Sequence, residues 1–193
     1  ESACKNLEWA LSNCAANGFA EFNCLQDRTQ PFLHTIAYAM RGFLEIGDYT
    51  GRKDFLDQAI LMGDALLPHV GGDGNIPGRF DKDWKPTVNW ACLTGNAQIS
   101  INWCRLYQIT GDEKYLKAAR AVMDFTKSTQ LITTEAVDIK GGIKGSHPIN
   151  GGYHPWQYPN WATKFFADAL MILISIESGK GPYIVQGNKS TVV

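Results

Sequence analysis

The sequence has little charge and no excess of either sign. Lysine and arginine number 18 against 19 aspartates and glutamates, a formal net charge of −1, and charged residues make up only 19% of the 193 residues. Nucleic acids and anionic membranes attract proteins through basic patches, so we expect no nucleic-acid partner. The most apolar stretch, residues 165–176, is interrupted by Asp168 and is too short to cross a bilayer, which predicts no membrane insertion.

Metal, redox and nucleotide motifs are missing as well. The five cysteines show no C-x-x-C spacing, which argues against a zinc ribbon or a redox-active pair and predicts reduced, mostly buried thiols. The sequence contains no G-x-S-x-G, P-loop, G-x-G-x-x-G or H-E-x-x-H motif. We therefore expect no metal, no cofactor and a cytoplasmic location.

An internal repeat is the clearest positive signal in the chain. Residues 49–59 recur as residues 109–119, with a Thr-Gly pair, an aromatic-Leu pair and an alanine in register. Glycine commonly ends a helix in the left-handed conformation, and an aspartate at the next helix start complements the helix dipole. Each copy thus predicts a helix end at Gly51 or Gly111, a tight turn and a new helix, the second of which begins at Asp112.

The apolar residues predict six helices of two kinds. Three lie on the outside, and the two that follow the repeats show one apolar and one polar face: 3–16, the helix after Gly51 and the helix after Gly111. Three are apolar on nearly every side, which predicts burial all round: 32–46, 92–108 and 160–177. This alternation predicts one all-α domain over 1–193, in which three α-hairpins stack side by side. Residues 131–139 are the only candidate for a short strand or hairpin arm.

The predicted connections are short at one end and long at the other. Residues 47–53 and 109–112 form short turns, whereas 17–31, 69–90 and 130–160 form long loops, which more often carry function. Aromatic rings in these loops either build a cleft for sugar rings or pin the loops onto the helix ends. They are Phe19, Phe22, Phe32, Phe80, Trp84, Trp90, Tyr153, Trp156, Tyr158 and Trp161.

The segment 79–84 holds the best candidate carboxylate. Asp81 and Asp83 stand two residues apart beside Arg79 and Trp84. Asp81 has the chemistry of a general acid or base, and Arg79 that of a bidentate anion ligand. The alternative is a surface turn in which Arg79 has an internal partner.

The segment 151–161 is the densest group of candidate residues. His154 titrates near neutral pH and suits proton transfer, while Tyr153 and Tyr158 offer hydroxyls and Trp156 an aromatic face. His147 lies seven residues earlier in the same loop. The two histidines lack helical ligand spacing and a third ligand, so they do not predict a metal site.

Polar residues also stand near the starts of the inner helices. His34, Asn96 and Lys164 belong to helices that are otherwise apolar. Such residues either bond to one another and to the loops, or they face a cavity. We treat these three as candidate ligand contacts.

Several motifs together resemble the helical repeats of the (α/α)-toroid superfamily. They are Pro31-Phe-Leu-His-Thr-Ile-Ala-Tyr-Ala-Met-Arg-Gly42, Ile76-Pro-Gly-Arg-Phe-Asp81, Cys92-Leu-Thr-Gly-Asn-Ala-Gln98, Ile109-Thr-Gly-Asp112, and Gly142-Ile-Lys-Gly145 through Pro159-Asn-Trp-Ala-Thr-Lys-Phe-Phe-Ala-Asp-Ala-Leu170. The resemblance is to squalene-cyclase/prenyltransferase-like and six-hairpin-glycosidase-like proteins, often associated with polysaccharide biosynthesis. It implies a glycoside hydrolase, polysaccharide lyase, uronyl epimerase or terpenoid cyclase. The last is less expected, because the sequence has no Asp-x-Asp-Asp motif and no repeated Gln-Trp signature.

The chain offers three hairpins where this superfamily has about six, so it resembles half of a toroid. A half-ring leaves an apolar edge that soluble monomers rarely tolerate. We therefore expect a homodimer that completes the helical ring.

These features combine into one functional hypothesis and one alternative. The protein is expected to bind a saccharide or uronic acid and to catalyse hydrolysis, elimination or epimerisation. Asp81 and His154 would act as the acid/base pair, Arg79 would hold an anionic group, and Trp84 and Trp156 would stack on sugar rings. The alternative is a non-catalytic binding or scaffold module, a remnant of a longer enzyme.

Overall fold

The computed structural model describes residues 1–24 and 26–179, and its main elements are helices. They are α1 (Ser2–Ser12), α2 (Leu33–Thr50), α3 (Lys53–Leu66), α4 (Leu93–Thr110), α5 (Glu113–Ser128) and α6 (Asn160–Glu177), with a 3-10 turn, η1 (Leu67–His69), after α3. Strands β1 (Ala91–Cys92) and β2 (Ser146–His147) pair antiparallel. The all-α prediction is confirmed. Within the described residues, no helix is long and apolar enough to span a membrane.

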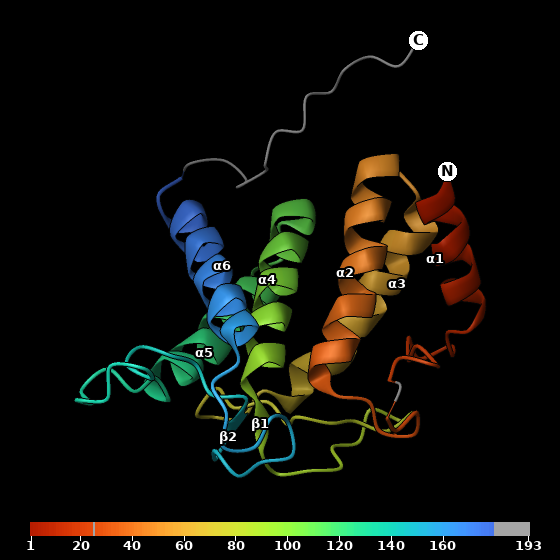
Figure 1. Cartoon of the computed structure of the whole chain (residues 1–193). Coiled ribbons are helices and arrows are strands. Elements are labelled where there is room, and N and C mark those ends of the chain that lie inside the picture. Colours follow the sequence, from red (N-terminus) through yellow and green to blue (C-terminus); the bar gives the residue numbers. More distant parts are fainter. Residues whose placement is uncertain (25, 180–193) are drawn as a thin grey trace.

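The predicted alternation of inner and outer helices is also confirmed. Helices α2, α4 and α6 stand in one row, and α3 and α5 lie behind them (Figure 1). Helix α4 packs against both α2 and α6, while α3 packs on α2 and α5 packs on α4. Helix α1 lies at the edge of the row, against α2 and α3.

The two repeats form the tight turns that the sequence predicts. Helices α2 and α4 end at Gly51 and Gly111, whose φ angles of 69° and 72° are left-handed. The Asp112 side chain accepts a hydrogen bond from the backbone N–H of Lys114 and caps α5. Since these turns reverse the chain at one end, all three long connections gather at the other end (Figure 1).

Burial of the inner helices differs from the prediction. Residues 91–104 are buried throughout, because α4 has neighbours on both flanks and α5 behind it. Helices α2 and α6 end the row, and each keeps an exposed face with large apolar side chains: Tyr38 (51% exposed) on α2, and Met171 (42%) and Ile174 (62%) on α6. The expectation that α2 and α6 are buried all round is therefore wrong.

The short strand expected at 131–139 is absent from that segment, which has neither helix nor strand. The only two-stranded sheet in the described part of the chain joins β1, before α4, to β2, before α6, with Ala91 opposite His147. This pairing depends on a contact between distant segments, which local patterning does not reveal. It ties two of the long loops together beside the starts of two inner helices.

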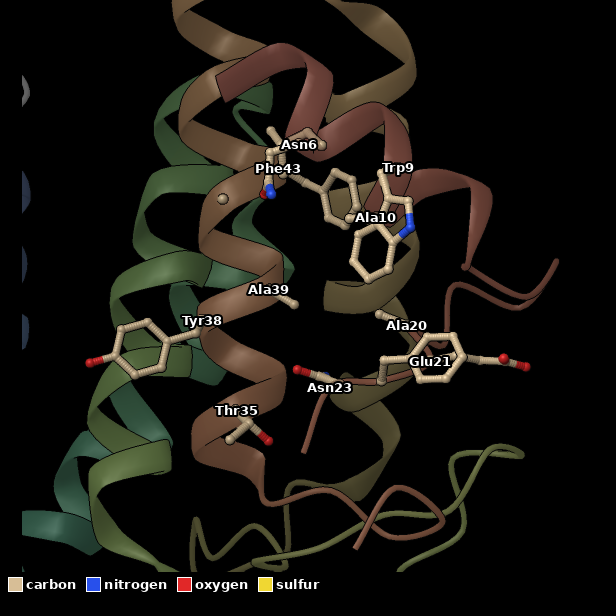
Figure 2. Close-up of a pocket in the computed structure, with 13 residues that line it drawn as sticks. Asn6, Trp9, Ala10, Ala20, Glu21, Asn23, Thr35, Tyr38, Ala39 and Phe43 are labelled. Atoms are coloured by element: carbon tan, nitrogen blue, oxygen red, sulfur yellow. The ribbon is translucent and has the colours of Figure 1, made fainter. Parts of the chain in front are cut away.

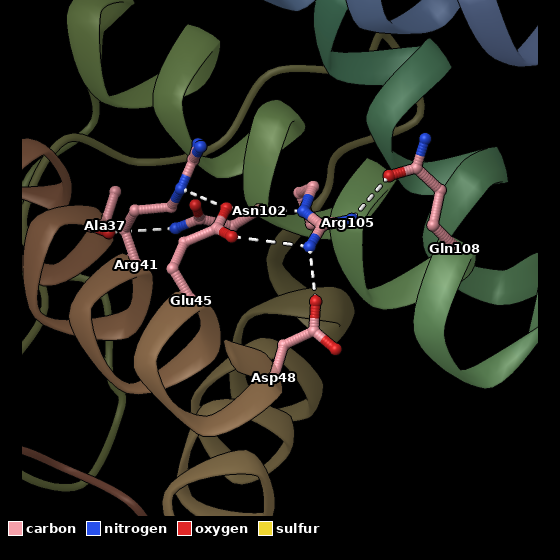
Figure 3. Close-up of polar contacts among 7 residues, drawn as sticks. All are labelled: Ala37, Arg41, Glu45, Asp48, Asn102, Arg105 and Gln108. Carbon is pink, nitrogen blue, oxygen red and sulfur yellow. Dashed lines mark hydrogen bonds and ion pairs between the residues drawn. The ribbon is translucent and has the colours of Figure 1, made fainter. Parts of the chain in front are cut away.

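An ion-pair network joins α2 to α4 (Figure 3). The Arg105 side chain is only 11% exposed, and its guanidinium donates to Asp48 at 2.7 Å, to both oxygens of Glu45 at 3.3 Å and to Gln108 at 2.8 Å. Arg41 also pairs with Glu45, at 2.6 Å. Because one guanidinium bridges several partners, the network sets the register between the two inner helices.

We expect the Arg105→Met substitution to lower the free energy of unfolding by roughly 1–3 kcal/mol, since it leaves Glu45 and Asp48 without their shared cation. The measurement is the urea midpoint of unfolding. Lys53→Met is the control: Lys53 pairs with Asp57 on the surface of α3 with its side chain 83% exposed, so its loss should cost less than about 0.5 kcal/mol. Equal losses in the two variants would contradict a stabilising role for the network.

Candidate functional site

A pocket of about 480 Å³ opens where α2 and α6 begin, at the long-loop end of the molecule. Three parts of the chain line it: the loop before α2 (Cys24, Gln26 and Phe32), α2 itself (His34, Thr35 and Tyr38), and the segment that enters α6 (Tyr153, His154 and Trp161). Most of its walls are therefore aromatic rings or imidazoles. No aspartate, glutamate, lysine or arginine is among these lining residues.

Two histidines in this pocket flank one tyrosine. The ring centroid of Tyr153 lies 5.2 Å from that of His34 and 4.8 Å from that of His154. Tyr38 packs edge-on against His34 at 4.9 Å, and Trp161 packs edge-on against His154 at 5.1 Å. Histidines from α2 and from a loop more than a hundred residues later thus share one site.

The loop that carries His154 is held in an unusual conformation. The φ angle of His154 is 47°, in the left-handed region that residues other than glycine rarely adopt. A Cβ atom on Gly145 would lie 2.7 Å from the Cβ of His154, so this close approach requires glycine. The buried Ser146 hydroxyl donates to the Tyr153 carbonyl at 2.7 Å and accepts its N–H at 3.0 Å. The surrounding loop thus determines where Tyr153 and His154 lie.

Each histidine makes its Nδ1 hydrogen bond to a glutamine. The Nδ1 of His34 lies 2.8 Å from Oε1 of Gln98, and the Nδ1 of His154 lies 2.9 Å from Oε1 of Gln157. A carbonyl oxygen only accepts, so this arrangement suits the tautomer with the proton on Nδ1, in which a neutral ring keeps its lone pair on Nε2. Gln98 is buried, whereas Gln157 is exposed.

Burial sets the protonation of the pocket. It lowers the pKa of His34, the bond to Gln98 opposes this shift, and the nearby His154 lowers the pKa further. Burial also raises the pKa of Tyr153 to about 12, and the Tyr153 hydroxyl accepts a hydrogen bond from Nε1 of Trp161 at 3.1 Å. Near neutral pH the site therefore presents a neutral imidazole at His34 beside a protonated phenol.

A second cavity, an apolar groove of about 420 Å³, lies between α1, residues 20–23 and α2 (Figure 2). Trp9 and Phe22 stack at 6.4 Å and remain 59% and 47% exposed. Thr35 and Tyr38 line both this groove and the first pocket, which holds His34 and His154 and is called the histidine pocket below. The groove lies at the α2 end of the helix row, where α2 has no further inner helix beside it among the described residues.

The chain is similar in structure to several carbohydrate-active proteins. The cellobiose 2-epimerase of Spirochaeta thermophila superposes with a TM-score of 0.69 at 13% identity over 89% of this chain and 46% of its own. The GH76 α-mannanase of Bacteroides thetaiotaomicron gives 0.63 at 17% identity, over 89% and 44%. The unsaturated glucuronyl hydrolase of Bacillus sp. GL1 gives 0.60 at 18% identity, over 84% and 44%. No family model and no curated protein matches the chain.

The chain has the α/α-toroid fold. It spans about half the length of these six-hairpin toroid proteins, as the count of three hairpins predicts. In this half-toroid, α2, α4 and α6 are the inner helices. The histidine pocket lies between the two end helices of the row at the long-loop end.

The half-toroid brings together three of the predicted site residues: His34, Tyr153 and His154. It adds Tyr38 and Trp161, which were missing from the predicted site. Tyr38 follows His34 by four residues, a spacing that places both on one helix face, so the sequence did contain a signal. Gln98 stands out in the sequence as a polar residue on an inner helix, for which a structural role was expected; its bond to His34 depends on the packing of α2 on α4 and could not be predicted.

Asp81 is not part of this pocket, which corrects its expected pairing with His154. Its Oδ1 accepts hydrogen bonds from the backbone N–H groups of Asp83 and Lys85, both at 2.9 Å. Asp83 pairs with the neighbouring Lys82 at 2.9 Å. The segment is a surface turn, the alternative that the sequence analysis left open.

The expected stacking residues also lie elsewhere. Trp84 is 6% exposed, packs edge-on against Phe19 and donates from Nε1 to the Asn17 carbonyl at 3.0 Å, so both its ring and its N–H are used internally. Trp156 is 71% exposed and does not line the pocket. Tyr158 is partly buried and lies against Gly142.

The expected cationic ligands are outside the pocket as well. Arg79 lies over the Phe32 ring at 3.6 Å and donates to the Gln30 carbonyl at 2.6 Å, so it supports the pocket wall from behind. Lys164 is exposed and pairs with Asp168 on α6. Neither cation is placed to hold an anionic group of a ligand in this pocket.

Asn96 and His147 occupy separate places. Asn96 is fully buried in α4, and because it precedes Gln98 by two residues it lies roughly 200° away around the helix. The Nδ1 of His147 lies 3.2 Å from Nζ of Lys144, and the ring packs edge-on against Phe125 at 5.6 Å. Among the described residues, no group of three or more His, Cys, Asp or Glu side chains is arranged to hold a metal ion.

Three histidines predict how stability depends on pH. Burial lowers the pKa of His34, His69 and His147 in the folded chain below the ordinary value of 6.5. The unfolded chain therefore binds more protons, so the free energy of unfolding should fall as pH decreases through and below 6.5.

Urea unfolding at pH 7.5 and pH 5.5 measures this change. The free energies of unfolding at the two pH values should differ less in the His34→Gln variant than in the wild-type chain. A free energy of unfolding that stays constant or increases on acidification would contradict the burial of these rings.

Proposed function

We propose that the histidine pocket binds a saccharide and moves a proton on it, as in epimerisation or isomerisation next to a sugar carbonyl. The observation that carries this proposal is the pair of imidazoles around Tyr153 in a pocket lined by no carboxylate. The aromatic walls suit the apolar faces of sugar rings. Two structures with this fold are named as cellobiose 2-epimerases, which supports the same reaction class.

The two histidines would have opposite roles. Neutral His34 takes the proton from the C–H group beside the carbonyl of an open-chain sugar onto Nε2, which gives an enolate and an imidazolium. His154 would supply a proton from Nε2 of its imidazolium form to the opposite face of the same carbon, which restores the carbonyl compound with inverted configuration. The low pKa of His34 suits a base that is neutral at the start of the cycle.

The pocket supports hydrolysis less well, although several of the matched structures are named as hydrolases, among them a mannanase, a glucuronyl hydrolase and an α-amylase. Glycoside hydrolysis generally needs two carboxyl groups on either side of the scissile bond. The described residues supply none to this pocket. The same lining holds no lysine or arginine, so a neutral sugar fits better than the uronic acid expected from the sequence.

Deuterium exchange tests the proton transfer. Cellobiose incubated in D2O with the protein should gain deuterium at C2 and form its C2 epimer, both detected by NMR. His34→Gln and His154→Gln should each slow this exchange by about 100-fold or more, since each removes one proton-transfer group.

His69→Gln is the matched control, because His69 packs on Phe80 outside the pocket. Release of glucose without deuterium at C2 would favour a hydrolase. Calorimetric binding of cellobiose without either reaction would favour the non-catalytic binding module.

We also propose that a second copy of the chain completes the ring. Both edges of the helix row are apolar. At one edge lies the groove between α1 and α2, whose small residues are Ala10, Ala39 and Gly42. At the other edge, α6 exposes Met171 and Ile174. Helices α2 and α6 are both 18 residues long, so α6 of a second copy matches the length of its would-be neighbour. Three hairpins from each copy make the six of the matched proteins.

Light scattering at micromolar concentration should therefore give a dimer mass. Ile174→Glu places a charge in the proposed interface and should yield monomers, while Leu61→Glu, a change at an exposed leucine on outer helix α3, should leave the dimer intact. A monomeric wild-type chain would overturn the proposal.

A reducing, cytoplasmic location remains part of this proposal, because all five cysteines are free thiols.

A further inference from the structure

The hydrogen bond between Gln98 and His34 joins two inner helices inside the core. Gln98 lies on α4 and is 5% exposed, and its Oε1 is 2.8 Å from Nδ1 of His34 on α2. Gln98 is one of several buried polar residues on α4, with Thr94, Asn96, Ser100 and Asn102, and burying such a side chain costs free energy unless its polar atoms are hydrogen-bonded. Its contact with a pocket histidine points to a role in the site.

We infer that Gln98 is a positioning residue, which holds His34 in the Nδ1–H tautomer and so keeps the Nε2 lone pair available to the ligand. This inference rests on the proposed function for its chemical purpose, but the tautomer itself is independent of any reaction. The Nε2 atom has no hydrogen-bond partner among the described residues, and His34 lines the pocket.

The amide suits this role better than a carboxylate does. Both groups accept the Nδ1 proton, but a carboxylate would stabilise the imidazolium and make His34 a poor base. A neutral amide oxygen fixes the tautomer without adding charge. The choice of glutamine therefore agrees with a histidine that must stay neutral before the proton transfer.

The other groups around His34 do not compete with Gln98 for control of its tautomer. Tyr38 and Tyr153 present their rings at 4.9 and 5.2 Å, Cys24 lines the same pocket, and His154 lies beyond Tyr153. None of these is a carboxylate. Arg79 faces the Phe32 ring.

The second histidine provides an internal comparison. Gln157 accepts from Nδ1 of His154 at 2.9 Å but is exposed, so water competes for both partners. The hydrogen bond to His34 is thus more shielded from water than the bond to His154. This asymmetry agrees with His34 as the base and His154 as the group that exchanges protons with solvent.

NMR of the full chain with ¹⁵N-labelled histidine tests the inference directly. Long-range ¹H–¹⁵N correlations report which ring nitrogen carries the proton, and the His34→Gln variant assigns the His34 signals. The variants are Gln98→Met, which keeps the size and removes the acceptor, and Gln98→Glu, which adds a charge. Gln58→Met is the matched control, because Gln58 is also 5% exposed but donates to the Gly18 carbonyl at 2.8 Å, away from the pocket.

Wild-type His34 should be the Nδ1–H tautomer near neutral pH. Gln98→Met should move it toward Nε2–H, and Gln98→Glu should raise its pKa by about one unit or more. Gln58→Met should change neither, and Gln157→Met should leave the His34 signals in place. A wild-type Nε2–H tautomer, or a Gln98→Met variant with unchanged signals, would overturn the inference.

Failure here and failure of the proposed function have different signatures. If the tautomer responds as expected but cellobiose gains no deuterium, the positioning role stands and the proton-transfer function fails. If deuterium enters through His34 while Gln98→Met leaves tautomer and rate unchanged, the function stands and the positioning role fails. In an active protein, Gln98→Glu should also move the acidic limb of the kcat/KM profile to higher pH.

Discussion

The packing of α4 between α2 and α6 is the constraint on which the rest of this structure depends. This helix alone has an inner neighbour on each flank, and its buried face includes Trp103, whose indole N–H donates to the Gly63 carbonyl on α3. Hydrogen bonds and an ion pair between α4 and α2 add directional contacts to this apolar packing. Gln98 reaches α2 near the pocket, Asn102 donates to the Ala37 carbonyl at 2.8 Å, and Arg105 bridges the far ends. Apolar burial holds the row together, and these bonds set its register.

The pocket is a consequence of that row. Because α2 and α6 begin at the same end and on either side of α4, the residues that start them lie across a short gap. Tyr38 on α2 and Phe165 on α6 have ring centroids 5.9 Å apart. The loop before α6 then brings Tyr153 and His154 over the gap, where Gly145 and Ser146 position it. Each of the three segments supplies three of the lining residues, and the packing of the helices brings them together.

The sequence predicted the ends and caps of the helices correctly, but it did not predict where all the side chains of the long loops lie. Gly51, Gly111 and Asp112 have the expected roles because turns and caps depend on residues a few positions apart. His154 and Tyr153 were recognised by their chemistry, and His34 by its position near a helix start. Asp81 was misjudged, since a carboxylate that caps its own turn looks the same in sequence as one that faces a ligand. Trp84 was misjudged because an aromatic loop residue gives no sign of whether its ring is buried.

The sequence by itself determined an all-α chain of three hairpins with its long, aromatic loops at one end. Those features follow from periodicity and turn residues, which act over a few positions. Only the tertiary structure decided which polar residues share a pocket: His34 with His154, Gln98 behind His34, and Asp81 and Arg79 outside. Contacts between residues more than sixty positions apart depend on how the inner helices pack. The same packing left the outer flanks of α2 and α6 open, which no local pattern distinguishes from a fully buried helix.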